Sequence, residues 1–248
     1  MSHRKLVIIP TYNELENISD MVQTVMELEE NFELLILDDG SPDGTAALVK
    51  TLQNSFEGRL HLIERAGKLG LGTAYIAGFR WALARKYDFI FEMDCDFSHD
   101  PKDLIRLYQA IKDRSFDLAI GSRYITGVNV VNWPIGRVLM SYFASKYVNF
   151  ITGLPIQDAT AGFKCYHRSV LEKINLDAIQ FIGYAFQIEM KFTAWKLGFK
   201  LIEVPIIFTD RTRGQSKMSP GIFKEAVLGV IWMKIKSIIS PFQSVKSY

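Results

Sequence analysis

Short, uninterrupted apolar runs alternate along the chain with segments of helical pattern, and this alternation limits the possible fold more than any other feature. Runs such as Glu33–Asp38 (ELLILD) and Asp88–Met93 (DFIFEM) lack the polar alternation of a half-exposed strand. Such strands are typical of a mostly parallel sheet with helices on both faces. Strands are predicted at 6–10, 33–38, 60–63, 88–93 and 116–120, and helices from about 14, over about 44–53 and 73–85, and from Pro101. We therefore predict an α/β fold built on an open, mostly parallel sheet flanked by helices.

The composition is that of a folded globular protein without a strong overall charge. Of the 248 residues, 48% are hydrophobic and 23% are charged, which argues against disordered, collagen-like and coiled-coil chains. The formal net charge is only +2, so no global basic field indicates a nucleic-acid partner. Cys95 and Cys165 form no CxxC pair, as is typical of a protein in a reducing cytosol.

Neither end of the sequence predicts a membrane-spanning segment. The N-terminal apolar run ends at Pro10 and is too short for a signal peptide. Near the C-terminus, the longest uncharged apolar stretch is 226–233, whereas a bilayer core requires about 20 residues. Contact with a membrane is therefore expected at its surface or through an anchoring partner.

Polar, acid-rich turns follow three of the predicted strands. They are 10–14 (PTYNE), 38–44 (DDGSPDG) and 94–99 (DCDFSH). Any one of them could simply be a turn or a helix cap. Because ligands of open α/β sheets bind beyond the carboxyl ends of the strands, three such turns are expected to converge on one crevice.

Asp94 and Asp96 are the strongest candidates for metal ligands. Two carboxylates this close repel each other unless a cation relieves the charge. No His or Cys cluster competes, so oxygen ligation and Mg²⁺ or Mn²⁺ fit better than zinc. At the end of the second strand, a carboxylate of Asp38 or Asp39 could accept a hydrogen bond from a nucleotide base or ribose hydroxyl.

A glycine-rich segment, Gly67–Gly72, follows the third predicted strand and opens a helix. Its spacing is G-x-x-G-x-G rather than the G-x-G-x-x-G of dinucleotide-binding folds, and the sequence has no Walker lysine–serine pair. The backbone amides, together with Arg65 and Lys68, could still hold a nucleotide.

Seven motifs follow one another in order. They are Pro10-x-Tyr12-Asn13-Glu14, Asp38-Asp39-Gly40-Ser41-x-Asp43-Gly44-Thr45, Lys68-Leu69-Gly70-Leu71-Gly72, Asp94-x-Asp96-x-Ser98-His99-x-Pro101, Gly121-Ser122-Arg123-Tyr124, Asp158-x-Thr160-x-Gly162-Phe163-Lys164 and Arg211-x(2)-Gly214-x-Ser216-Lys217. Over about residues 5–220 this set resembles the dolichol-phosphate (polyprenol-phosphate) mannose synthases of glycosyltransferase family 2. The first motifs are shared by the wider family, whereas the full ordered set is specific to polyprenyl-phosphate transferases.

The resemblance implies a GT-A-type fold and a metal-dependent hexosyltransferase. It implies GDP-mannose as the donor, a polyprenyl (dolichyl or undecaprenyl) phosphate as the acceptor, and Mg²⁺ or Mn²⁺ at the donor diphosphate. Mannose would be transferred with inversion to give polyprenyl phosphate β-mannose, by a peripheral protein on the cytoplasmic side of a membrane.

Three alternatives remain open at this point. A UDP-sugar-dependent polyprenyl-phosphate glucosyl- or aminosugar transferase fits the same pocket composition. A nucleotidyltransferase would need a basic glycine-rich signature after the first strand, where Pro10-Thr11-Tyr12-Asn13 stands instead. A catalytically dead binding module is disfavoured because the acidic and basic candidates are retained together.

The resemblance also implies roles for individual residues. The donor would be bound by Pro10, Tyr12, Glu14, Leu37, Asp39, Lys68, Asp94, Cys95, Asp96, Arg123, Arg211 and Lys217. Of these, the catalytic residues would be Asp96, Arg123, Arg211 and Lys217. The metal would be held by Asp94, Asp96 and Ser98, and the acceptor phosphate by Arg137 and Ser141. Whether Asp158 and Lys164 bind substrate or brace the site stays open.

Two apolar segments are candidates for contact with a bilayer surface. We predict a GT-A domain over 1–219, with a membrane-interface helix at 133–152, and a basic amphipathic segment at 220–248. Residues 211–248 carry seven Lys or Arg against one acid, Glu225. Such a helix can lie in the interface with its lysines reaching the headgroups. Alternatively, either helix covers the core of its own domain or pairs with a partner subunit.

Overall fold

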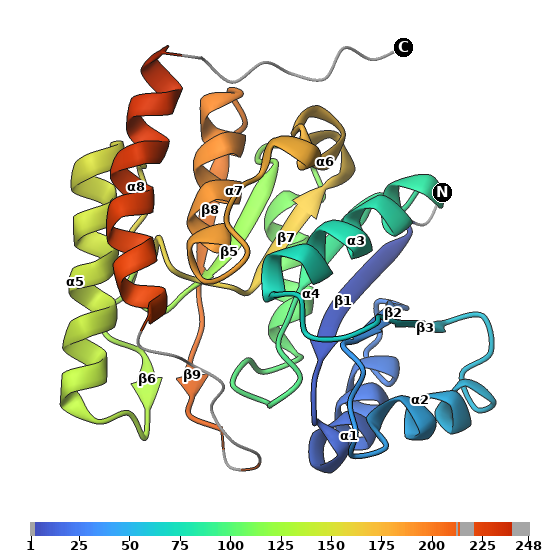
Figure 1. Cartoon of the computed structure of the whole chain (residues 1–248). Coiled ribbons are helices and arrows are strands. Elements are labelled where there is room, and N and C mark those ends of the chain that lie inside the picture. Colours follow the sequence, from blue (N-terminus) through green and yellow to red (C-terminus); the bar gives the residue numbers. More distant parts are fainter. Residues whose placement is uncertain (1–2, 212, 214–220, 240–248) are drawn as a thin grey trace.

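A seven-stranded sheet forms the centre of the computed structural model, which describes residues 3–211, 213 and 221–239 (Figure 1). Its strands are β1 (Lys5–Thr11), β2 (Glu33–Asp38), β3 (Leu60–Glu64), β4 (Phe89–Glu92), β5 (Leu118–Ser122), β7 (Lys164–His167) and β8 (Leu201–Pro205). Their order is β3-β2-β1-β4-β7-β5-β8, and every pairing is parallel except the two made by β7. The predicted open, mostly parallel α/β sheet is confirmed.

Helices cover both faces of the sheet. One face carries α1 (Leu15–Met26), α2 (Thr45–Gln53) and α4 (Asp103–Ile111). The other carries α3 (Leu71–Ala84), α5 (Ile135–Thr152), α6 (Arg168–Lys173), α7 (Ala185–Lys196) and α8 (Gly221–Ile239). A short 3₁₀ turn (Leu176–Ala178) lies between α6 and α7, and β6 (Val130–Val131) pairs in parallel with β9 (Phe208–Thr209).

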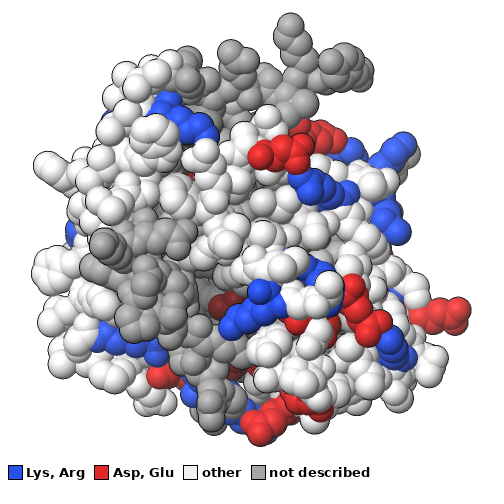
Figure 2. Space-filling model, in the orientation of Figure 1, with Lys and Arg blue, Asp and Glu red and all other residues white. Residues whose placement is uncertain are grey.

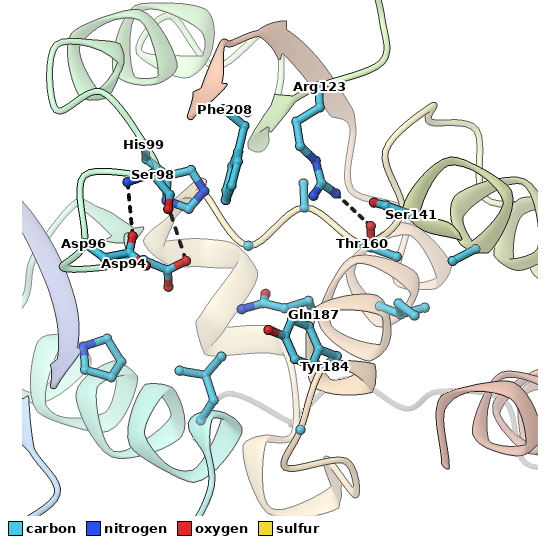
Figure 3. Close-up of a pocket in the computed structure, with 18 of the residues that line it drawn as sticks. Asp94, Asp96, Ser98, His99, Arg123, Ser141, Thr160, Tyr184, Gln187 and Phe208 are labelled. Atoms are coloured by element: carbon cyan, nitrogen blue, oxygen red, sulfur yellow. Dashed lines mark hydrogen bonds and ion pairs between the residues drawn. The ribbon is translucent and has the colours of Figure 1, made fainter. Parts of the chain in front are cut away.

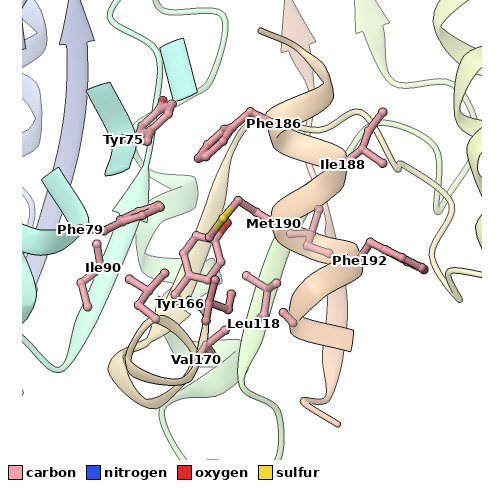
Figure 4. Packing of buried hydrophobic residues seen from close by; sticks show 14 of the residues in the cluster. Tyr75, Phe79, Ile90, Leu118, Tyr166, Val170, Phe186, Ile188, Met190 and Phe192 are labelled. Carbon is pink, nitrogen blue, oxygen red and sulfur yellow. The ribbon is translucent and has the colours of Figure 1, made fainter. Parts of the chain in front are cut away.

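Each face has its own hydrophobic core. On the α3–α7 side, Tyr75 and Phe79 of α3 pack with Phe186 and Met190 of α7 around Tyr166 of β7 (Figure 4). The rings of Tyr75 and Phe186 are stacked 6.0 Å apart. Full burial of an aromatic or aliphatic side chain contributes roughly 1.5–3 kcal/mol to folding. This core fixes α7 against the sheet and so holds the residues at the start of α7 in place.

The five predicted strands are present, with boundaries that differ by at most two residues at either end. The sequence pattern missed β6 to β9. β6 and β9 have only two residues each, and β7 has four, of which Lys164 and His167 are polar. Lys164 nonetheless has no exposed surface. Because it contains a lysine, β7 does not show the apolar pattern by which a central strand is recognised in a sequence.

The C-terminal helix α8 packs against α5 and α7 of the same chain. Val230 and Met233 belong to the core, and the Tyr147 hydroxyl of α5 donates a hydrogen bond to the Val227 carbonyl (2.9 Å). Lys234 Nζ donates to the Thr152 carbonyl at the end of α5 (3.1 Å). One face of α8 thus covers the core of its own domain, as the alternative interpretation of this segment had it.

The outer sides of α5 and α8 expose large apolar side chains. They are Ile135, Leu139, Met140, Phe143 and Phe150 on α5, and Leu228, Ile231, Trp232, Ile235, Ile238 and Ile239 on α8. In the view of Figure 2, the described part of the surface over these helices carries few charged groups, whereas Lys, Arg, Asp and Glu gather on the opposite side. No helix within residues 3–211, 213 and 221–239 combines the length and the apolar character needed to cross a bilayer.

Candidate active site

A cavity of about 1150 Å³ lies beyond the carboxyl ends of the strands. The turns after β1, β2 and β4 all contribute to its lining, as their predicted convergence required. Its other walls come from the segments after β3, β5 and β9, the segment before β7, and the helices α5, α7 and α8. Figure 3 shows a close view of this cavity, with side chains from opposite walls directed towards its centre.

Most of the predicted site residues line this cavity. They are Pro10, Tyr12, Glu14, Asp39, Lys68, Asp94, Cys95, Asp96, Ser98, Arg123, Arg137, Ser141 and Arg211. Leu37 is not among the lining residues, because its side chain is fully buried in the core, where it packs near Gly78 of α3. Lys217 lies outside the described residues.

The two aspartates after β4 form the acidic end of the cavity. Asp96 accepts a hydrogen bond from the Ser98 backbone amide (3.1 Å) and forms an ion pair with Arg211 (2.9 Å). Loss of hydration in the cavity, together with the negative charge of Asp96, raises the pKa of Asp94 to about 7. Among the described residues, Arg211 offsets this negative charge only in part.

This donor set fits a hard divalent cation. Both side chains supply carboxylate oxygens, and a cation would relieve both causes of the raised Asp94 pKa, first the loss of hydration and second the charge of Asp96. In the described part of the chain, no group of three or more His, Cys, Asp or Glu residues is arranged to hold a metal. Mg²⁺ or Mn²⁺ at Asp94 and Asp96 would therefore need further oxygen ligands from a substrate or water, as is common for Mg²⁺.

His99 packs between two aromatic rings beside this turn. Its ring is almost fully buried, stacks on Phe163 at 4.8 Å and meets Phe208 edge-on at 5.2 Å. Burial lowers the pKa of His99 to about 4, so the ring is neutral at physiological pH. Its Nδ1 lies 3.8 Å from an Asp94 oxygen, beyond hydrogen-bonding distance.

A second group of residues lies where β1, β2 and the glycine-rich segment meet. Arg65 pairs with Asp39 (2.9 Å), and Lys68 Nζ lies 5.3 Å from the centre of the Tyr12 ring. Burial raises the pKa of Asp39, and Arg65 opposes that effect. An aromatic ring beside a buried carboxylate and a lysine suits a nucleoside and its phosphates.

Asp38, in contrast, braces its own turn. It accepts hydrogen bonds from the Thr11 hydroxyl (3.0 Å) and the Ser41 hydroxyl (2.6 Å) and does not line the cavity. Of the two adjacent carboxylates, Asp39 is therefore the one available to a ligand.

Arg123 is a fixed cation in the wall opposite the aspartates. Its Nε and Nη2 donate to the two carboxylate oxygens of Asp158, both at 2.7 Å, and Nη2 also donates to Thr160 (2.8 Å; Figure 3). Although burial alone would raise the pKa of Asp158, the guanidinium holds it below its ordinary value. Asp158 thus holds the guanidinium of Arg123 in a fixed orientation.

Arg137 and Ser141 lie one turn apart on α5 and both line the cavity. The Arg137 guanidinium lies over the Trp133 ring, 4.1 Å from its centre, and pairs with Asp210 (2.8 Å). The two predicted acceptor-phosphate residues are therefore brought together near Arg123. Beyond them, the walls become apolar, with Phe143, Tyr147, Ile188, Val227 and Val230 from α5, α7 and α8.

Sequence reasoning missed the contribution of α7. Tyr184 and Gln187 line the cavity between the aspartates and the cationic wall (Figure 3). The signal that could have found Gln187 is an amide side chain within an otherwise apolar stretch, AFQI, at the start of a helix.

Comparisons with known proteins identify the family of the chain. Residues 6–175 match the family Glycosyl transferase family 2. The chain is 48% identical to the polyprenol monophosphomannose synthase of Mycolicibacterium smegmatis over 92% of its own length and 86% of that protein's. It is 45% identical to the undecaprenyl-phosphate mannosyltransferase of Micrococcus luteus over 92% of both chains.

Solved structures share the fold at much lower identity. One is glucosyl-3-phosphoglycerate synthase from Mycobacterium tuberculosis with Mn²⁺, UDP and phosphoglyceric acid (TM-score 0.65, 17% identity, 96% of this chain and 79% of that chain). Another is the mannosyltransferase PcManGT from Pyrobaculum calidifontis with GDP-Man and Mn²⁺ (TM-score 0.57, 16% identity, 94% and 70%). The predicted GT-A-type fold and the predicted similarity to polyprenyl-phosphate mannose synthases are confirmed, and the chain belongs to glycosyltransferase family 2.

Proposed function

We propose that this protein transfers mannose from GDP-mannose to a polyprenyl phosphate with inversion, giving polyprenyl phosphate β-mannose, in a reaction that requires Mg²⁺ or Mn²⁺. The observation that carries the proposal is the cavity itself, whose walls change from acidic at Asp94 and Asp96 to cationic at Arg123 and Arg137, and then to apolar between α5 and α8. The acidic wall suits a metal–diphosphate, the cationic wall a lipid phosphate, and the apolar wall a prenyl chain.

The comparisons support the mannose donor and the lipid acceptor. One sequence relative is named for the synthesis of polyprenol monophosphomannose and the other for the transfer of mannose to undecaprenyl phosphate. Both align over most of the chain. PcManGT was solved with GDP-Man and Mn²⁺, whereas glucosyl-3-phosphoglycerate synthase was solved with UDP and Mn²⁺. Because this fold accommodates both nucleotides, the preference for GDP-mannose rests on the sequence relatives.

The acceptor supplies its own nucleophile. A phosphomonoester has a second pKa of about 6 and is largely dianionic near neutral pH. An attacking oxygen of this kind needs no strong general base, in contrast to a sugar hydroxyl. This fits a site whose buried imidazole, His99, is neutral and held between aromatic rings. A single in-line displacement by this oxygen inverts the sugar to the β configuration.

Charged side chains on the two walls would hold the reacting groups. Arg137 suits the lipid phosphate, because a guanidinium can donate two parallel hydrogen bonds to phosphate oxygens. Arg123, for which the resemblance implied a donor contact, already donates to Asp158 and Thr160, and we propose that it adds its positive charge to the wall that faces the lipid phosphate. Arg211, next to Asp96, would offset the charge that develops on the leaving diphosphate. A cation bound at Asp94 and Asp96 would supply further charge neutralisation there.

The proposed prenyl-lipid acceptor and the exposed apolar sides of α5 and α8 together indicate a peripheral membrane protein. A polyprenyl phosphate stays in the bilayer, so its phosphate must be reached from the membrane surface. The apolar end of the cavity lies between α5, α7 and α8, where Phe143 both lines the cavity and is exposed, and Trp232 is exposed on α8. We therefore propose that these two helices lie on the cytoplasmic face of a membrane, with Lys236 near the headgroups.

The donor preference is tested by incubating the protein with a polyprenyl phosphate, Mg²⁺ and one radiolabelled sugar nucleotide at a time. Label from GDP-mannose is expected in the lipid fraction, and label from UDP-glucose and UDP-N-acetylglucosamine is expected to stay in the aqueous phase. Transfer from a UDP-sugar in preference to GDP-mannose would favour the alternative glucosyl- or aminosugar transferase.

Replacing Arg137 with lysine is expected to raise KM for the lipid acceptor by about tenfold or more, with little change in KM for GDP-mannose. Lysine keeps the positive charge but loses the planar donor pair and the packing on Trp133. Steady-state kinetics with each substrate varied in turn measures the effect. Arg114→Lys, in a partly exposed pair with Asp117 that does not line the cavity, serves as the control. Normal kinetics for the lipid in Arg137→Lys would remove this residue from the acceptor site.

Introducing charge on α8 is expected to weaken binding to vesicles by at least tenfold. Trp232 and Ile235 are 53% and 41% exposed, and Trp232→Asp with Ile235→Asp would place two carboxylates against the membrane. Flotation with vesicles that contain anionic lipid measures binding. Thr51→Asp with Asn54→Asp adds the same charge on the exposed side of α2 and should leave flotation unchanged. Equal flotation of both variants would exclude α8 from the membrane contact.

A further inference from the structure

Gln187, in the first turn of α7, has one end of its side chain fixed by a buried lysine. Lys164 of β7 donates a hydrogen bond from Nζ to Gln187 Oε1. An ammonium group has donors and no acceptor, so only the oxygen end of the amide can face it. This contact determines the orientation of an amide whose two ends otherwise look alike.

Lys164 is itself fixed from the other side. It pairs with Glu92 Oε2 at 3.1 Å, and Glu92 Oε1 accepts a hydrogen bond from the Tyr166 hydroxyl at 2.8 Å. Lys164, Glu92 and Tyr166 are all fully buried. A buried charge pair of this kind is costly to disturb, so Lys164 acts as a positioning residue for the amide of Gln187.

The Nε2 group of Gln187 is therefore directed into the cavity. Gln187 lines the cavity although only 2% of the residue is exposed, and no hydrogen bond of Nε2 is formed with the described part of the chain. A Cβ at Gly162, which also lines the cavity, would lie 3.6 Å from Nε2. Glycine at that position leaves the approach to the amide open. The N–H groups of Nε2 can therefore be reached from the cavity by an acceptor on a ligand.

The position of Gln187 matches that of the transferred group. In Figure 3 it lies between the Asp94–Asp96 wall and the wall that carries Arg123, Thr160 and Ser141. If the donor diphosphate occupies the first wall and the acceptor phosphate the second, the sugar that passes between them lies beside Gln187. The groups that a hexose presents to its surroundings there are hydroxyl oxygens.

The geometry points to a role for Gln187 that rests on the proposed function: its Nε2 donates a hydrogen bond to a hydroxyl oxygen of the transferred sugar. Lys164 sets the direction of that donor. The hydrogen bond from the ammonium polarises the amide and strengthens its N–H groups as donors. Gln187 then contributes to sugar recognition, separately from the residues that hold the nucleotide and the lipid phosphate.

The test compares ligands with and without the sugar. In Gln187→Leu and Gln187→Glu, kcat/KM for GDP-mannose is expected to fall about tenfold or more, while the affinity for GDP, which lacks the sugar, stays within twofold of the wild type. Thr193→Val is the matched control on the same helix, because Thr193 is buried, does not line the cavity and has an unpaired hydroxyl within the described structure. It should leave both quantities unchanged.

A set of deoxy-mannose donors identifies the contact. With the wild type, kcat/KM for the analogue that lacks the contacted hydroxyl should be about tenfold lower than for GDP-mannose. With Gln187→Leu, the two donors should have the same kcat/KM, since the hydrogen bond is already absent. In Lys164→Met, the ratio of GDP-mannose affinity to GDP affinity should fall even where overall stability falls too. An equal loss of GDP affinity in the Gln187 variants, or additive losses with every analogue, would overturn the assignment. Absence of turnover in the wild type would instead count against the proposed function.

Discussion

Replacing Asp96 with asparagine is expected to reduce mannosyl transfer about a thousandfold, which corresponds to roughly 4 kcal/mol of transition-state stabilisation. Asparagine can still accept the hydrogen bond from the Ser98 amide, so the turn should keep its conformation. It cannot supply the negative charge that a divalent cation and Arg211 need. The loss should therefore appear in catalysis and metal affinity and not in folding.

Turnover of GDP-mannose, together with calorimetric titration of Mg²⁺ in the presence of GDP, measures both effects. Asp100→Asn is the matched control, because Asp100 is exposed in the same loop and its carboxylate accepts a local hydrogen bond from the Lys102 amide (2.9 Å). Near-normal turnover in Asp96→Asn, or activity that survives chelation of all divalent ions, would refute a metal site at these aspartates.

The second large effect is expected for Arg123→Met, which should destabilise the fold by about 3–5 kcal/mol and abolish transfer. Asp158 has no exposed surface, and without the guanidinium its buried carboxylate loses its ion-pair partner and keeps the hydrogen bonds from the Arg123 backbone amide and the Thr160 hydroxyl. The variant also removes a cation from the wall proposed to hold the lipid phosphate. Urea unfolding measures the stability change.

Two further variants separate stability from catalysis. Arg123→Lys keeps the charge beside Asp158 but cannot reproduce the two bonds of 2.7 Å, so stability should fall less while transfer remains strongly reduced. Arg106→Met removes a partly exposed pair with Asp103 and should cost at most about 1 kcal/mol. If the free energy of unfolding of Arg123→Met fell by less than about 1 kcal/mol, the Arg123–Asp158 pair would not be what stabilises this wall of the cavity.

The sequence predicts the half of the fold whose signals are local. Glu33–Asp38 has the same boundaries in the structure as in the prediction, because a run of buried aliphatic residues is visible without any knowledge of its neighbours. The acidic turns could be placed together as well, since the carboxyl ends of parallel strands share one edge. For this reason Asp39, Asp94 and Asp96 are found in one cavity.

The other half depends on contacts between distant residues. Lys164 reads as a surface residue, but Glu92, 72 positions earlier, makes its burial in β7 possible. Gln187 reads as a helix residue of no special role until Lys164 fixes its oxygen. Leu37 lies next to Asp38 and Asp39 in sequence, yet the alternation of side chains along β2 directs it into the core.

The two surface helices illustrate the same limit. Apolar residues and lysines in α8 suggested an interfacial helix, and its sequence alone could not tell which side is buried. Packing assigns Val230 and Met233 to the core and leaves Trp232 and Ile238 exposed. One side of α8 therefore covers the hydrophobic core, and the other side presents an apolar surface.

The central claim is that one cavity brings a metal-bound sugar diphosphate to the phosphate of a prenyl lipid. Its most direct test is incubation of the protein with GDP-mannose, Mg²⁺ and a short polyprenyl phosphate, followed by mass spectrometry and NMR of the lipid fraction. The expected product is a polyprenyl phosphate that carries one β-linked mannose and does not form once EDTA is added. Recovery of unmodified lipid, or of an α-linked product, would contradict the account.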